Sequence, residues 1–436
     1  MTTDAHPQLQ RRAIIENVCW LFADKVLRLG GGLVVGGLIA RHLGPEQYGL
    51  WNYAIAFSSL FGACASLGLD SIMVREIVRN PQARAALLST AFYLKLIAGI
   101  LALATAAIAI HMVRPGETTA LILVCLSGLG FVFQAAQVAD FELQAGNNNR
   151  ISVIAQNAAF LLMTIVKIVL LTQQAPLLAF AIAGAIEVAL GMSFLLATFF
   201  WRGGRIDVVH ANWTVARRLL ADSWPLMLGG IAVSLYMRID QVMLGAYLDD
   251  HSVGIYSAAV RISEAWYFIP MAISTALFPT IVKLKEANPT SYRNRMQQYF
   301  DVMFVLGLAA AIVVTLVGPT LVNTLYGPEY ANAGRLLVLH SWAGIFVSLG
   351  VASSSWLATE GLQSYALVRT ALGCVCNIGL NIILIPTMGA AGAVVGTLVA
   401  YGIATHSLIL FPQTRTCGTM LVKALLPLRL IRRSPS

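Results

Sequence analysis

The chain has 436 residues, of which 58% are hydrophobic and only 11% are charged. A soluble domain carries about 25% charged residues, so this composition excludes a soluble globular protein. It also excludes a disordered chain, because disorder goes with low hydrophobicity and high net charge. The composition therefore indicates an integral membrane protein.

Apolar runs long enough to cross a bilayer recur along the whole chain. A hydrocarbon core about 30 Å thick needs about 20 apolar residues per helix. The runs predict an all-α integral membrane protein with twelve transmembrane helices, at residues 13–40, 50–69, 88–111, 117–139, 151–172, 176–200, 222–247, 254–281, 301–325, 331–358, 364–386 and 388–412. Clusters of turn-forming residues separate them, such as Leu43-Gly44-Pro45 and Pro386-Thr387-Met388-Gly389.

Lysine and arginine are distributed unequally between the loops on the two sides of these helices. Nineteen lie on the side of the N-terminus and two, Arg41 and Arg114, lie on the other side. Cytoplasmic loops carry the excess of basic residues, so both termini are expected in the cytoplasm. This bias and contact with anionic lipid head groups explain the net charge of +9, and no nucleic-acid partner is expected.

A short internal repeat suggests that the chain has two related halves. At an offset of 205 residues, Leu43, Gly49, Trp51 and Ala54 are in register with Leu248, Gly254, Tyr256 and Ala259. The match supports two pseudo-repeated six-helix lobes, at residues 1–210 and 211–412, followed by a basic amphipathic tail at 413–436. Repeated halves are a common plan among transporters.

Basic residues inside the predicted helices outnumber acidic ones. The basic residues are Lys25, Arg28, Lys95, Lys167, Arg238, Arg261, Arg335 and Arg369, and the acidic ones are Asp24, Glu187, Asp240 and Glu264. Each basic residue costs about 2.5–3.5 kcal/mol at the centre of a spanning helix, so it is expected to face a polar interior, to pair or to snorkel. The excess of positive charge predicts an interior that accepts an anion.

The spacing of these charges leaves several arrangements open. Asp24, Lys25 and Arg28 share one face of the first helix, although Asp24 and Arg28 are also spaced to neutralise one another. Arg238 and Asp240 are two residues apart and point to different faces of the seventh helix.

In the eighth helix, Arg261 and Glu264 are spaced to pair. Lys95 and Lys167 either reach the interior or snorkel, whereas Arg335 and Arg369, near helix ends, are expected to snorkel. The seven histidines show no pair at ligand spacing, so neither a metal site nor a cofactor is expected.

Several sequence stretches follow one another in a characteristic order along the twelve helices. They are Ile39-Ala40-Arg41-His42-Leu43-Gly44-Pro45-Glu46-Gln47-Tyr48-Gly49, Leu67-Gly68-Leu69-Asp70, Val74-Arg75-Glu76, Phe278-Pro279, Leu325-Tyr326-Gly327-Pro328-Glu329-Tyr330, and Asn377 with Asn381-Ile382-Ile383-Leu384-Ile385-Pro386, Gly389 and Gly392-Ala393. In this order they resemble the Wzx-type polysaccharide flippases of the multidrug/oligosaccharidyl-lipid/polysaccharide exporter superfamily.

The resemblance implies two six-helix lobes around a central cavity that opens alternately to either side of the bacterial inner membrane. The implied substrate is an oligosaccharide repeat unit on undecaprenyl pyrophosphate, moved to the periplasmic leaflet for O-antigen or exopolysaccharide biosynthesis. Implied partners are membrane lipids, a polysaccharide polymerase and a chain-length regulator.

The charged residues inside the helices are assigned to two roles under this reading. Lys25, Arg28, Arg238 and Arg261 are expected to bind the pyrophosphate, with Lys95 and Lys167 as further candidates. Coupling to a proton or sodium gradient needs a carboxylate that changes its state during transport. Asp24, Asp240 and Glu264 are the candidates for that carboxylate.

Two other functions stay open at this point. A drug exporter of the same superfamily would have the same fold, but a cationic drug favours an acidic interior. A non-transporting scaffold of a polysaccharide assembly complex would not need a polar interior. An enzyme is not expected, because the loops are short and contain no Asp-x-Asp pair.

Overall fold

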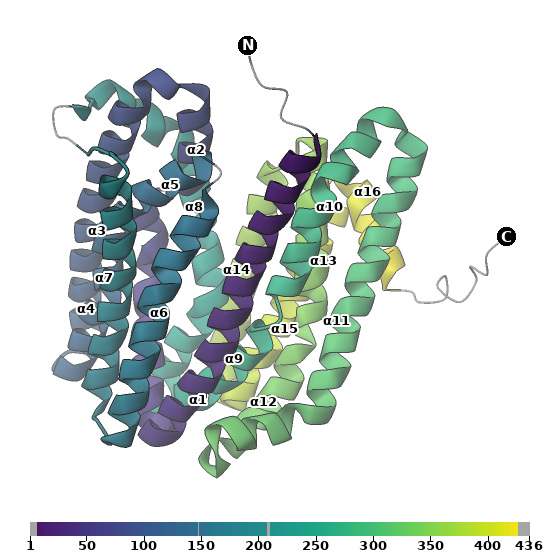
Figure 1. Cartoon of the computed structure of the whole chain (residues 1–436). Helices are drawn as coiled ribbons and strands as arrows, with labels where there is room; N and C mark the ends of the chain where they lie inside the picture. Colours follow the sequence, from purple (N-terminus) through teal and green to yellow (C-terminus); the bar gives the residue numbers. More distant parts are fainter. Residues whose placement is uncertain (1–6, 147, 207–209, 426–436) are drawn as a thin grey trace. The chain divides into compact units, whose positions relative to one another are not determined.

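The computed structural model describes residues 7–146, 148–206 and 210–425, with side chains except those of residues 7–24 and 26. These described residues form helices joined by short turns, which confirms the predicted all-α class (Figure 1). The helices of the first half are α1 (Pro7–Ser66), α2 (Asp70–Arg79), α3 (Arg84–Val113), α4 (Thr118–Phe133), α5 (Val138–Ala145), α6 (Asn149–Thr172), α7 (Leu177–Trp201) and α8 (Trp213–Tyr247). Those of the second half are α9 (Asp250–Glu264), α10 (Phe268–Ala287), α11 (Pro289–Tyr326), α12 (Ala331–Ser341), α13 (Ala343–Glu360), α14 (Ser364–Met388), α15 (Ala390–His406) and α16 (Arg415–Ala424).

The described residues contain eleven segments that are long and apolar enough to cross a membrane. The first of them, Leu27–Arg79, has 53 residues. As one straight helix with a rise of 1.5 Å per residue it would be about 80 Å long, far more than a single crossing requires, but it also includes α2, which begins after a turn at residues 67–69. Gly44 interrupts it with a non-helical backbone (φ 72°, ψ 168°) just before Pro45. Divided at Gly44, the segments correspond to the twelve predicted helices of a multi-pass membrane protein.

The helices pack into two units. The N-terminal unit comprises Met1–Leu43 and Leu50–Ser234, and the C-terminal unit comprises Gly44–Gly49 and Leu235–Ser436. The division falls inside α8, later than the lobe boundary expected at residue 210. The first half of α8 belongs to the N-terminal unit because it packs tightly there: a Cβ atom added to Gly68 would lie 2.7 Å from the Ser223 carbonyl oxygen. The six-helix repeat itself stays a prediction.

The N-terminal unit has its main core where the short helices α2 and α5 pack against α3, α7 and α8 (Figure 1). Buried side chains in this core include Met73 of α2, Leu87 of α3, Val138 of α5 and Phe199 of α7. α2 buries one face of its ten residues and exposes basic side chains on the other. It therefore packs as an amphipathic helix rather than as a membrane crossing.

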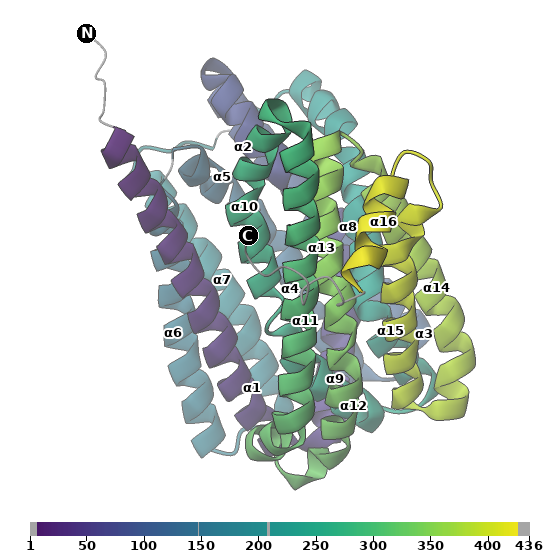
Figure 2. The ribbon, with the colours of Figure 1, turned by 90° about the vertical axis from the view of Figure 1, so that its right-hand side faces the viewer.

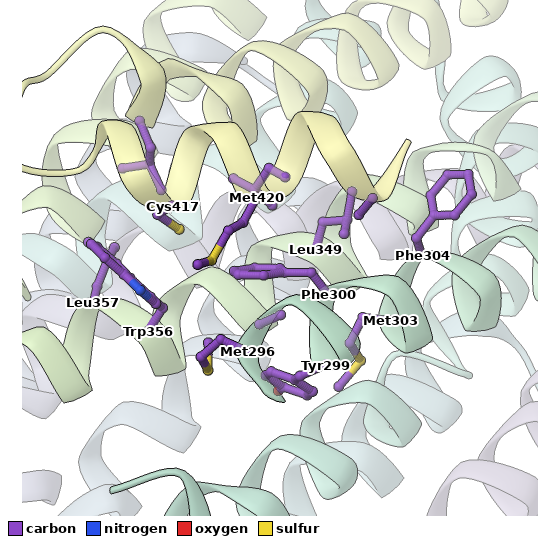
Figure 3. Packing of buried hydrophobic residues seen from close by; sticks show 14 of the residues in the cluster. Met296, Tyr299, Phe300, Met303, Phe304, Leu349, Trp356, Leu357, Cys417 and Met420 are labelled. Atoms are coloured by element: carbon purple, nitrogen blue, oxygen red, sulfur yellow. The ribbon is translucent and has the colours of Figure 1, made fainter. Parts of the chain in front are cut away.

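The C-terminal unit has its core between α11, α13 and α16 (Figure 3). Phe300 and Met303 of α11, Trp356 of α13 and Met420 of α16 are among the buried side chains. Figure 2 shows α14 beside α15, which also contacts α16. Burial raises the pKa of the Cys417 thiol on α16 to about 12, so the thiol packs as a neutral group.

The described part of the predicted tail, residues 413–425, is therefore attached to the core of the C-terminal unit through α16. Residues 426–436 lie outside the described residues.

Two glycines of the proposed repeat pack against one another inside the C-terminal unit. A Cβ atom added to Gly49 would overlap the Asp250 carbonyl oxygen, and one added to Gly254 would overlap the Pro45 carbonyl oxygen. Only glycine at both positions lets the two backbones approach this closely. This contact explains why residues 44–49 pack with the C-terminal unit although they lie within α1.

Candidate functional site

The C-terminal unit contains a buried carboxylate that is surrounded by neutral hydrogen-bond donors. Asp240 of α8 is 3% exposed. Its Oδ2 atom accepts hydrogen bonds from the hydroxyl groups of Tyr256 on α9 (2.6 Å) and Thr397 on α15 (2.5 Å). Its Oδ1 atom accepts one from the Asn381 side-chain amide on α14 (2.6 Å). Four helices thus converge on one negatively charged group.

Small residues allow these helices to approach Asp240. A Cβ atom added to Gly396 would lie 2.5 Å from the Asn381 side-chain oxygen, and one added to Gly392 would overlap the Leu384 carbonyl oxygen. Close packing of α14 against α15 therefore brings Asn381 and Thr397 to the same carboxylate. The positions of these ligands depend on glycine at two points of α15.

The groups around Asp240 have the chemistry of a site for a small cation. Asn377 and Asn381 are fully buried, and the Asn381 amide also bonds to the Asn377 oxygen at 3.3 Å. The Asn381 side-chain oxygen has no hydrogen-bond partner among the described residues. Carboxylate, amide and hydroxyl oxygens are the ligands that hard cations prefer. Among the described residues, no group of three or more His, Cys, Asp or Glu side chains is placed to hold a metal ion.

Arg238 and Asp240 have different partners, in line with their spacing of two residues. Its guanidinium donates to the Glu264 carboxylate of α9 at 3.2 Å. Two candidates with different expected roles, an anion-binding arginine and an ion-coupling carboxylate, therefore neutralise one another. The neighbouring Gln241 donates to Ser257 at 3.2 Å.

Arg261 lies beside two tyrosines rather than forming the pair with Glu264 that its spacing allows. Its neighbours are Tyr48, of the 44–49 segment, and Tyr326, at the end of α11. Tyr48 and Tyr326 form an aromatic cluster with Tyr330, with ring centroids 5.3–6.2 Å apart. Arg261 is thus placed on the aromatic contact that attaches the 44–49 segment to the C-terminal unit.

Both lysine candidates of the N-terminal unit form ion pairs. Lys95 is fully buried, and its ammonium donates to Asp70 at 2.6 Å and to Gln137 at 2.7 Å. Lys167 donates to Glu187 at 2.5 Å. Asp70 and Gln137 also line an open cavity of about 470 Å³. Each lysine is compensated by a carboxylate, so neither snorkels.

The polar face of α1 is described from Lys25 onward, and the Asp24 side chain lies outside the described residues. Lys25 is exposed. The Arg28 guanidinium donates to Asn157 of α6 at 3.0 Å and lies 5.6 Å from the centre of the Phe160 ring. Gly31, one turn later, lets the Phe160 ring approach α1. Arg28 thus contacts an amide and an aromatic ring.

The structure adds residues that the charge pattern does not indicate. Tyr256, Asn377, Asn381 and Thr397 complete the Asp240 site, yet neutral polar residues are common in spanning helices and carry no distinctive signal. Asn377 and Asn381 belong to the stretches that carry the family resemblance, and Tyr256 belongs to the internal repeat, but neither signal assigns these residues to a site. The partners of Asp240 are up to 157 residues away in the sequence, so a local sequence pattern does not predict these contacts.

The sequence of this chain is similar to those of several known membrane proteins. The probable flippase AglR of Haloferax volcanii is 31% identical over 175 residues, which are 38% of this chain and 35% of AglR. The chain thus matches about a third of the length of that relative. The probable low-salt glycan biosynthesis flippase Agl15 of the same organism is 23% identical over 399 residues, covering 86% of this chain and 79% of Agl15.

Solved structures share the fold. A structure of the lipid II flippase MurJ in an inward closed conformation matches 97% of this chain and 94% of its own, with a TM-score of 0.71 at 14% identity. The MatE family matches residues 225–383. The family described as polysaccharide biosynthesis protein matches residues 14–285, more than half of the chain. The chain therefore belongs to the polysaccharide biosynthesis protein family, which confirms the resemblance indicated by its motifs.

Proposed function

We propose that this protein is a flippase that moves undecaprenyl-pyrophosphate-linked oligosaccharide repeat units from the cytoplasmic to the periplasmic leaflet of a bacterial inner membrane. The observation that carries the proposal is the family match over residues 14–285. The multi-pass helical fold shared with a lipid II flippase supports it. Transport proceeds by alternating access and leaves the substrate chemically unchanged, and both termini face the cytoplasm.

The contacts divide the six proposed substrate-binding residues into two groups. Arg238, Lys95 and Lys167 each pair with a carboxylate, so their charges are already offset. We propose that these basic side chains bind the substrate only when the partner carboxylate is protonated or binds a cation, because the ion pair is then broken. Lys25, Arg28 and Arg261 form the second group: Lys25 is exposed, Arg28 contacts Asn157, and Arg261 lies beside Tyr48. We propose that their cationic side chains bind the pyrophosphate oxygens.

Asp240 is the strongest of the three proposed ion-coupling carboxylates. Its described partners are neutral, and the unpartnered Asn381 oxygen adds a second ligand of the kind that a cation binds. Glu264, in contrast, is paired with Arg238. Binding of a proton or of sodium would neutralise Asp240 and weaken the hydrogen bonds that hold the four helices around it. The bound ion would thereby favour one conformation over the other.

A liposome assay tests transport directly. Purified protein is reconstituted with a polyprenyl-pyrophosphate oligosaccharide, and the sugar exposed on the opposite leaflet is measured with a membrane-impermeant probe. We expect exposure to be faster than in protein-free vesicles. An unchanged rate with the native sugar donor would overturn the proposal and favour a scaffold role. Transport of small cationic molecules instead would favour the drug-exporter alternative, which the MatE match supports.

Ion coupling is tested with imposed sodium and proton gradients in the same liposomes. In Asp240→Asn the charge is lost while the shape is kept and one of the two acceptor oxygens is replaced by an NH2 donor, and we expect the stimulation by the gradient to disappear. Asp301→Asn is the matched control, because it removes a carboxylate of α11 that accepts a hydrogen bond from Gln297 and is assigned to neither role. If Asp240→Asn responds to both gradients as the wild type does, coupling through Asp240 is wrong, whatever the rate of flipping.

A further inference from the structure

Arg369 of α14 is bound by neutral groups of the neighbouring helix α13. Its Nη2 atom donates to the Gly350 carbonyl oxygen at 3.0 Å and to the Ser354 hydroxyl at 2.7 Å. Its Nη1 atom donates to the Ser353 hydroxyl. Both serine hydroxyls in turn donate to the Gly350 carbonyl oxygen. The guanidinium is therefore held in one orientation by three acceptors, none of which carries a charge.

The position of this guanidinium differs from the snorkelling expected from the sequence. α13 ends at Glu360 and α14 begins at Ser364, so these two helix ends lie at one level. Arg369 is about 8 Å along α14 from this level, whereas Gly350 is about 15 Å along α13, at 1.5 Å per residue. The side chain thus extends away from the nearer helix end and toward the middle of the unit. Snorkelling would take it the other way.

The environment of the Arg369 charge differs from that of three other cations in the spanning helices. Lys95, Lys167 and Arg238 each lie within 3.2 Å of a carboxylate oxygen. No carboxylate among the described residues forms an ion pair with Arg369. A guanidinium has five N–H donors, of which the contacts with α13 use three. The arrangement therefore leaves a fixed positive charge with donor capacity for an anion.

The contact between Arg369 and α13 includes an exposed side chain. Within residues 352–357, all of which the structure describes, Ser354 is exposed and the other five residues are buried. Arg369 itself is half-buried. The guanidinium thus donates to one buried serine, Ser353, and to one exposed serine, Ser354.

We propose that Arg369 binds a phosphate group of a lipid, held in place for that contact by Ser353 and Ser354. The inference rests on the proposed function, which supplies the pyrophosphate of the carrier lipid as the principal source of this group. Guanidinium groups bind phosphate through paired N–H donors, and lysine at the same position provides only a point charge. An anionic phospholipid head group offers the same chemistry and is the second source.

Binding is measured on the purified full chain in nanodiscs, with a polyprenyl-pyrophosphate oligosaccharide as the probe. We expect Arg369→Gln to weaken binding at least about tenfold and Arg369→Lys to weaken it less, because lysine keeps the charge but not the fork. Arg335→Gln removes an exposed arginine from the same unit and is the matched control. A polyprenol-linked oligosaccharide without phosphate should bind the wild type and Arg369→Gln equally.

Competition by phosphatidylglycerol vesicles distinguishes the two lipid sources. Competition that depends on Arg369 assigns the site to phospholipid head groups, and its absence assigns the site to the carrier. If Arg369→Gln does not fold, Arg369→Lys and Ser354→Ala, compared at equal thermal stability, give the same test. Equal binding of wild type and all Arg369 variants overturns this inference alone. Failure of the wild type to bind any polyprenyl-pyrophosphate overturns the proposed function instead.

Discussion

Lys95 shows how a buried cation is accommodated in a spanning helix. Its side chain is fully buried, while the side chain of its partner Asp70 is 52% exposed. The two ends of this ion pair therefore have different environments. Water can stabilise the carboxylate if it loses its partner, but it cannot reach the ammonium.

This asymmetry predicts unequal effects of the two single substitutions. Asp70→Asn leaves a buried positive charge with the neutral partners Gln137 and the Phe141 ring, and it should lower the free energy of unfolding by about 3–5 kcal/mol. Lys95→Met leaves an exposed carboxylate and should lower the free energy of unfolding by clearly less than Asp70→Asn does. Thermal unfolding of the detergent-solubilised variants measures both. A larger loss in Lys95→Met than in Asp70→Asn would contradict the role assigned to burial.

At this scale the sequence predicts which residues carry charge but not what they bind. The sequence identifies Asp240, Arg238 and Lys95 as charged residues inside spanning helices. Their partners come from distant parts of the chain, such as Thr397 for Asp240 and Gln137 for Lys95. Arg369 lies near a helix end, and the sequence therefore predicts that it snorkels. The sequence does not reveal the polar groups of the neighbouring helix α13, to which the side chain donates instead.

Whole helices were easier to predict than their interruptions. The breaks at Gly44, at Gly327 and at Gly389 were visible in the sequence, and all three glycines have a positive φ. The run at 254–281 was expected as one helix but is interrupted between Glu264 and Phe268. Pro270 follows this interruption within one turn and was expected to kink the run, because proline cannot donate the backbone hydrogen bond that would continue the helix.

The contact between Gly49 and Gly254 gives a prediction about helix packing. Gly254→Ala forces a methyl group against the Pro45 carbonyl oxygen and should destabilise the protein by about 1–3 kcal/mol. Gly379→Ala is the matched control, because a Cβ atom there meets nothing within 4 Å. The control should be neutral or stabilising by up to about 1 kcal/mol. Equal melting temperatures for both variants would show that the 44–49 segment is not packed against α9.

The start of α9 gives a prediction about pH. The Asp249 carboxylate accepts a hydrogen bond from the Ser252 backbone N–H at 2.7 Å, and this contact lowers the pKa of Asp249. Because the folded-state pKa is the lower one, the stabilisation is present above the unfolded value of about 3.9 and is lost as the pH falls through the folded-state pKa.

Asp249→Ala should lower the free energy of unfolding by about 1 kcal/mol at neutral pH. Asp249→Asn should retain most of the cap and lose this part of the pH dependence. Melting temperatures of the three proteins between about pH 6 and pH 3 measure the difference. A wild-type pH profile identical to that of Asp249→Asn would contradict the assignment.

For the whole molecule, composition determines the class and loop charge predicts the orientation. The lobe boundary at residue 210 stays a prediction: it lies in a polar loop, whereas the packing units divide inside the continuous helix α8. A loop marks where the chain turns, and packing partners decide to which unit a helix belongs. The contacts of Arg218 with Glu76 and of Gly68 with Ser223 attach the first half of α8 to the N-terminal unit.

The orientation is tested by cysteine labelling in intact cells. In a variant whose six native cysteines are replaced, Glu117→Cys should react with a membrane-impermeant maleimide. Gln82→Cys should react only after the inner membrane is made permeable. Both native residues are exposed in short connections between helices. The reverse pattern would place the termini in the periplasm.

The segment 44–49 has a consequence for how the protein is made. A gene divided between α7 and α8 would give two polypeptides, neither of which contains a whole unit. The first would carry Gly44–Gly49, which pack in the C-terminal unit, and the second would carry the part of α8 that packs in the N-terminal unit. Each fragment would need the other to complete its own fold. Co-expressed halves should therefore reassemble as an obligate heterodimer, while either half produced alone should be degraded.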